Sequence, residues 1–192
     1  YNFRIKFNKK INYGLLPKPH FSSKNISILH NEKEIANTNN LKIFIGFKDF
    51  LSINKINVKN LIFKNTDFYI YKKDLVFFEN LLKTEPNENR ILIKKSNIFF
   101  KNKDDEVLFI NKIFNSKFYY DSKNLQNILN LKNEIYNVPF KLTIKNDKFN
   151  KNVLTEFNSK KIRLNIDNKI DYDSQEKKGI LDILFINKNI SL

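Results

Sequence analysis

The sequence predicts a mainly β protein whose strands form a mostly antiparallel, meandering sheet. Apolar and polar residues alternate over many segments of strand length, as at Ile162, Leu164 and Ile166. Polar turns rich in Asn, Asp and Lys separate these segments, whereas the chain contains only 3 glycines and 4 prolines. Side chains that alternate with period 2 point to opposite faces of a strand, so each strand has one apolar and one polar side.

The chain opens with short extended segments. Residues 1–7 alternate apolar and basic side chains and predict a strand or the end of a longer helix, and residues 25–29 predict a strand. Between them, Pro17 and Pro19 enforce an extended backbone without ladder donors. A polar turn at residues 31–34 then leads to the central stretch.

Residues 41–71 form that central stretch, around which the rest of the chain is organised. Apolar residues occupy every second position from 41 to 47, and the alternation resumes at 56, slips by one residue after 58, and continues to 63. This pattern predicts two or three one-sided strands. The candidate face, which either packs on a core or lines a lipid groove, consists of Leu41, Ile43, Ile45, Phe47, Ile56, Val58, Leu61 and Phe63.

The period changes once, at residues 74–83. Leu75, Phe78, Leu81 and Leu82 recur at three- and four-residue steps, and Asp74 can cap the start. We therefore expect one or two short helices, this one serving as a lid or an end plug for the sheet.

The remaining segments return to strand patterning. Residues 123–130 fit a helix or a strand, and the strand is preferred. Residues 102–106 predict a hairpin turn. The other expected strands are 91–93, 97–101, 107–113, 118–120, 135–145, 153–158, 162–167 and 180–186. About ten strands in this order fit either a closed sandwich or barrel, or a long curved sheet with an apolar face.

Composition limits the function classes. The formal net charge of +15 favours anionic partners, although the Asn-, Lys-, Ile- and Phe-rich composition of a low-GC genome also explains it. With no cysteine, disulfides and cysteine-based sites are excluded. The sequence contains no run of about 20 apolar residues, the length that a membrane-spanning helix needs. No signal peptide is visible. Because the chain begins at Tyr1 and lacks methionine, we expect it to be a piece of a longer protein.

No residue constellation indicates an enzyme, a metal or a cofactor. His20 and His30 lack partner ligands at metal-binding spacing. Residues 104–106 lack the alternating oxygen ligands of a calcium loop, so a solvated turn is expected. Ser22 and Ser23 lack a nucleophile-elbow context. We therefore expect a non-enzymatic protein without catalytic, metal or cofactor sites.

Three segments resemble the AsmA family of bacterial envelope proteins (AsmA/TamB-like). Residues 16–28 resemble its proline-marked entry strand, and residues 41–71 its order of strand, apolar link and strand. Residues 138–142 resemble its Pro-Phe strand opening. The chain departs from the family in its link, where Asn54 and Lys55 stand in place of the usual glycine.

The resemblance implies a curved sheet with an apolar, groove-like inner face. Residues 1–192 would be one β-rich region, the N-terminal periplasmic part of a protein anchored in the inner membrane by a segment missing from this chain. It implies a role in outer-membrane biogenesis or in intermembrane phospholipid transport and organisation. The implied partners are phospholipid, or a membrane that bears it, and other envelope proteins.

Two alternatives stay open. A closed β-sandwich could bind a protein or carbohydrate through its loops. A basic nucleic-acid-associated domain ranks lower, because no known binding motif is present. The basic pairs, such as Lys94-Lys95 and Lys160-Lys161, are scattered along the chain and predict surface solvation, with contact to an anionic leaflet as the second interpretation.

Overall fold

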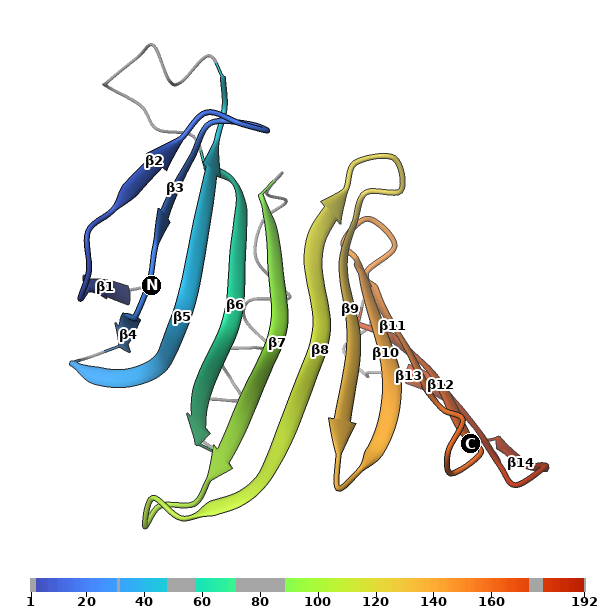
Figure 1. The fold of residues 1–192 in the computed structure, drawn as a ribbon. Helices are drawn as coiled ribbons and strands as arrows, with labels where there is room; N and C mark the ends of the chain where they lie inside the picture. Colours follow the sequence, from blue (N-terminus) through green and yellow to red (C-terminus); the bar gives the residue numbers. More distant parts are fainter. Residues whose placement is uncertain (1–2, 31, 48–57, 72–88, 173–177, 192) are drawn as a thin grey trace.

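A computed structural model describes residues 3–30, 32–47, 58–71, 89–172 and 178–191, all of whose strands lie in one sheet (Figure 1). The strands are β1 (Phe3–Phe7), β2 (Asn12–Gly14), β3 (His20–Ser23), β4 (Ile26–His30), β5 (Lys33–Ile45), β6 (Val58–Tyr71), β7 (Arg90–Lys101), β8 (Val107–Asp121), β9 (Gln126–Ile135), β10 (Val138–Asp147), β11 (Asn152–Ser159), β12 (Leu164–Asp171), β13 (Lys178–Phe185) and β14 (Lys188–Ser191).

The predicted fold class is confirmed. The sheet is single, curved, mostly antiparallel and unclosed, and the described residues form no helix. The closed sandwich or barrel that the sequence left open is therefore not adopted. The predicted helix at residues 74–83 lies outside the described residues.

Strand order follows the chain over most of the sheet. From β5 to β14 each strand lies beside its successor, and β4 and then β1 extend the other side of β5. β3 also pairs with β5, so β3 and β4 follow one another along the same edge of that strand. The result is a wide ribbon whose strand direction rotates from β5 to β13 (Figure 1), as expected for sheets of L-residues.

The central stretch forms two long strands. β5 begins earlier than the pattern suggested, at Lys33, and ends at Ile45. β6 pairs with it antiparallel, with a register shift at Phe44 and Ile45, where the partner positions skip Lys59. This bulge explains the slip in the sequence pattern after Val58, because one extra residue moves the following side chains to the opposite face.

One pair departs from the meander. β6 and β7 run parallel, with Leu61 beside Ile91 and Phe68 beside Ile98. Parallel neighbours need a crossover rather than a tight turn, and here the crossover falls in residues 72–88, outside the described part. Sequence patterning gives the two strands but not their relative direction.

Left-handed residues interrupt several strands. Asn65 and Lys95 have φ values of 54° and 49° and stand opposite one another in β6 and β7. Phe114 is the extra residue of a bulge in β8. These interruptions explain why the patterns at residues 91–93 and 97–101 look like two strands in the sequence, whereas the structure joins them in β7.

A buried polar ladder accompanies the interruptions. The hydroxyls of Thr38 and Thr66 lie 2.6 Å apart, and Ser96 Oγ accepts a hydrogen bond from the Thr66 amide at 3.1 Å. All three residues are buried. The ladder thus pairs buried hydroxyls and the Thr66 amide beside the left-handed residues Asn65 and Lys95.

Turns use few glycines, as the composition predicts. The described part has no glycine with positive φ, and the left-handed Asn and Asp residues are Asn25, Asn65, Asp105, Asn137 and Asn187. Two-residue turns with positive φ at both positions join β9 to β10 (Tyr136-Asn137) and β13 to β14 (Ile186-Asn187). Such turns match the right-handed twist of a hairpin.

Candidate functional site

The two faces of the sheet differ in chemistry. Cross-strand partners share a face, so the registers allow each face to be followed from strand to strand. One row crosses every strand from β5 to β14, and we call it the central row. Its members are Leu41, Phe63, Ile93, Ser116, Leu131, Leu142, Phe157, Ile166, Ile183 and Ile190.

A flanking row extends the apolar part of this face from β6 to β10. Leu61, Ile91, Phe118, Leu129 and Ile144 form a parallel row on the same side. We call the side that carries both rows the apolar face. Most of its residues from β6 to β13 are half-buried, with flanks covered by neighbours in the sheet. Because all described strands belong to one sheet, no second sheet or helix of the described residues covers their tips.

The structure brings six of the eight predicted face residues together. They form three cross-strand pairs on the apolar face: Leu41 with Phe63, Ile43 with Leu61, and Ile45 with Val58. Of the other two, Phe47 lies beyond the end of β5 with 71% of its surface exposed. Its predicted place in the strand is therefore wrong. Ile56 lies outside the described residues.

Burial divides these six residues. Leu41 and Ile45 are only 1% and 5% exposed, so they act as core. Ile43, Val58, Leu61 and Phe63 are half-buried. The sequence left core and groove undecided. The structure gives this face a buried core at the β3–β5 end, followed along the sheet by half-buried residues that no other described element covers.

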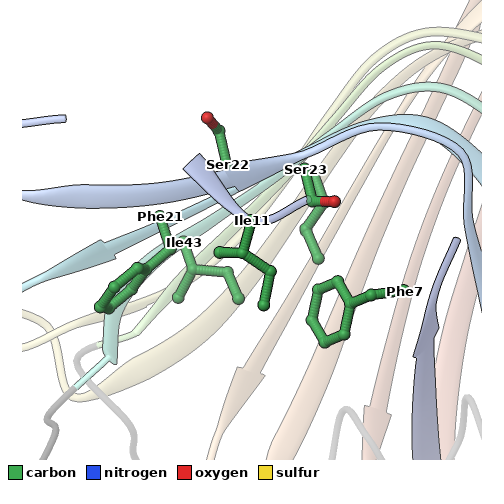
Figure 2. Close-up of a pocket in the computed structure, with 7 residues that line it drawn as sticks. Phe7, Ile11, Phe21, Ser22, Ser23 and Ile43 are labelled. Atoms are coloured by element: carbon green, nitrogen blue, oxygen red, sulfur yellow. The ribbon is translucent and has the colours of Figure 1, made fainter. Parts of the chain in front are cut away.

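A hollow of about 260 Å³ lies at this end of the apolar face. Figure 2 shows Phe7, Ile11, Phe21 and Ile43 on one side of the strand, with Ser22 pointing away. Leu41 and Ser23 complete the lining. Since the exposed lining is almost wholly apolar, the hollow suits a hydrocarbon segment and offers no group for acid–base chemistry.

Asn133 is an exception on the apolar face. It stands opposite Ile113 and Phe140, is 1% exposed, and neither of its side-chain polar atoms has a hydrogen-bond partner. The nearby Asn111 Oδ1 is also buried without a partner. A buried unpaired amide costs free energy, so Asn133 lowers the stability of the sheet.

We therefore expect Asn133→Leu to raise the free energy of unfolding by about 1–3 kcal/mol, because it removes the unpaired amide. Urea unfolding followed by circular dichroism measures this change. Asn130→Leu is the control, because Asn130 Oδ1 accepts a hydrogen bond from Thr143 Oγ1 at 3.1 Å, and this variant should not gain stability. A loss of stability in Asn133→Leu would show that the amide is paired in solution.

The opposite side, the polar face, carries charged and hydroxyl groups. On this face, Tyr71 donates a hydrogen bond to Asp105, and Lys101 Nζ lies 3.4 Å from the same carboxylate. The hydrogen bond from Tyr71, with a smaller contribution from Lys101, lowers the pKa of Asp105. Residues 104–106 thus anchor a hairpin, rather than forming only the solvated turn expected from the sequence.

His20 has a structural role. It is buried, its Nδ1 lies 2.9 Å from the Lys18 carbonyl oxygen, and its ring stacks on Phe44. Within the described residues, no group of three or more His, Asp or Glu side chains is placed to hold a metal ion. The described residues also include no helix long and apolar enough to cross a membrane.

Comparisons with known proteins add no relative: no family model matches the chain, and no curated protein matches it. The resemblance to AsmA proteins therefore stays a prediction.

Proposed function

We propose that this chain is a non-enzymatic lipid-binding region of AsmA type, which holds phospholipid acyl chains against the apolar face of its sheet. The observation that carries the proposal is the central row, in which nine of ten positions are apolar and Ser116 alone is polar. No other element of the described residues covers this row, and a long apolar surface left open on a protein marks a site for a ligand or a partner.

The dimensions support an extended hydrocarbon ligand. Adjacent strands lie about 4.8 Å apart, so nine strand intervals from β5 to β14 give a path of roughly 43 Å. One leaflet of a bilayer has a hydrocarbon depth of about 15 Å. The path therefore exceeds the length of one acyl chain, and its unbroken strand order suits movement or storage of several chains along the sheet.

The partial burial of the face also favours lipid over a hidden core. Packed cores exclude solvent almost completely, whereas Leu131, Leu142 and Phe157 in the middle of the central row are half-buried. An acyl chain that covers their tips would remove apolar surface from water, worth about 25 cal/mol per Å². The apolar hollow beside Leu41 would hold the end of such a chain.

The cellular role follows from the resemblance and belongs to the same proposal. In this account the chain is the N-terminal periplasmic part of a protein anchored in the inner membrane. It takes part in outer-membrane assembly or in phospholipid transport between the two membranes, with other envelope proteins as partners.

Native mass spectrometry of the protein after gentle extraction tests the proposal. We expect masses that correspond to bound phospholipid, which disappear when the protein is delipidated and return after incubation with phospholipid. Protein that stays lipid-free after incubation with phospholipid would refute acyl-chain binding.

A further inference from the structure

The polar face contains a row of lysines that the sequence does not reveal. Lys64 stands beside Lys94 across the parallel pair β6–β7, and Lys132 stands opposite Lys141 across β9–β10. Asn115 links the two pairs, since it is the cross-strand partner of both Lys94 and Lys132. We call Lys64, Lys94, Lys132 and Lys141 the basic row.

Among the described residues, no acid compensates the charge of these lysines. All four are exposed, and none takes part in an ion pair within the described residues. The neighbouring carboxylates are already engaged, Glu134 with Lys112 at 2.8 Å and Glu156 with Lys145 at 2.7 Å. Like charges directly opposite one another destabilise a sheet, so this arrangement favours an anionic partner.

A pocket with an apolar floor lies within the basic row. Its volume is about 220 Å³, and the lining includes Phe114, Pro139, Lys132 and Lys141. Phe114 is 52% exposed because the bulge in β8 places it outside the regular pairing. An exposed aromatic ring surrounded by lysines matches the amphipathic surface of a membrane interface.

The turn after β11 completes the rim. Lys160 and Lys161 line the same pocket, and Lys161 Nζ donates a hydrogen bond to the Asn137 carbonyl oxygen at 2.7 Å, which fixes it beside the β9–β10 turn. Four lysines, two from the basic row and two from this turn, therefore surround one apolar floor.

We propose that the basic row and the Phe114 pocket form a docking site for an anionic phospholipid surface. Phosphate groups contact the lysines, while Phe114 enters the boundary between headgroups and acyl chains. Charge complementarity supports this occupant: the chain carries a net charge of +15, and anionic leaflets attract exposed lysines. The lysines of the basic row lie on the face opposite the central row, so the site does not depend on acyl-chain binding there.

Vesicle flotation tests the site. At about 0.1 M salt the protein should float with vesicles of phosphatidylglycerol and phosphatidylcholine but not with phosphatidylcholine alone, since each lysine at an anionic surface adds measurable affinity. Lys132→Gln with Lys141→Gln should lower the bound fraction at least about tenfold. Phe114→Ser should lower it severalfold.

Matched controls separate the site from net charge and from the apolar face. Lys178→Gln with Lys188→Gln removes the same charge from β13 and β14 and should retain binding. Leu131→Asn with Leu142→Asn changes the central row and should also retain it. Equal losses in the two lysine variants, or no loss in Phe114→Ser, would overturn the proposal.

Two competitors test the source of the anion. Inorganic phosphate at millimolar concentration should not release the protein from vesicles, because a surface presents many phosphates to several lysines at once. Release by inorganic phosphate would show a site for a soluble anion instead. Preferential binding of single-stranded DNA over vesicles, with steep salt dependence, would assign the basic row to nucleic acid.

Discussion

Leu131→Asn combined with Leu142→Asn should reduce the binding of an acyl chain to the apolar face by at least about tenfold. These residues are cross-strand partners in the middle of the central row and are half-buried. Their loss removes apolar contact worth roughly 1.5–3 kcal/mol from a bound acyl chain, and about 1.4 kcal/mol corresponds to a tenfold change in affinity. Titration with a fluorescent acyl chain, with circular dichroism to confirm the fold, measures the effect.

The control for this variant uses the other face of the same strands. Asn130 and Thr143 are cross-strand partners on the polar face, so Asn130→Ser with Thr143→Ser alters β9 and β10 equally without touching the central row. Binding should be unchanged in this control. A similar loss in both variants would mean that the substitutions act through the stability of the sheet rather than through the ligand.

Leu41→Ala should lower the free energy of unfolding by about 2–5 kcal/mol, the range for truncating a fully buried leucine. Leu41 is 1% exposed and lines the apolar hollow, so the substitution enlarges an existing space that the surrounding strands cannot fill. Urea unfolding in the absence of lipid gives the value.

Ile43→Ala is the matched comparison. Ile43 lies two residues further along β5 and lines the same hollow, but it is half-buried. Its truncation should cost less than half as much in lipid-free protein, because part of the side chain is already in water. An equal or larger cost for Ile43→Ala would contradict the division of this face into a core and an open surface.

The strands themselves could be predicted because each has one apolar side. Of the ambiguous residues 123–130, residues 126–130 start β9 and 123–125 lie in the turn before it. The slip after Val58 is the bulge at Lys59. The alternation of apolar and polar residues could not show that a strand continues across a left-handed residue. Lys95 shifts the alternation in β7 by one position, so one strand looks like two.

The candidate sites depend on register, which a single sequence does not contain. The cross-strand pairs of Leu41 with Phe63 and Ile43 with Leu61 follow from the predicted one-sided strands. The basic row does not, because its lysines come from β6, β7, β9 and β10 and meet only through the parallel pair and the bulge in β8. In the sequence they look like scattered surface charges.

Site-specific photo-crosslinking to phospholipid tests the central claim most directly. A photoreactive phenylalanine at Phe157, in the central row of β11, should crosslink to the acyl chain of an added phospholipid. The same residue at the adjacent Glu156, which is the cross-strand partner of Thr143 on the polar face and lies outside the Phe114 pocket, should crosslink far less. Equal labelling at both positions, or labelling at position 156 alone, would contradict the assignment of the apolar face as the surface that holds acyl chains.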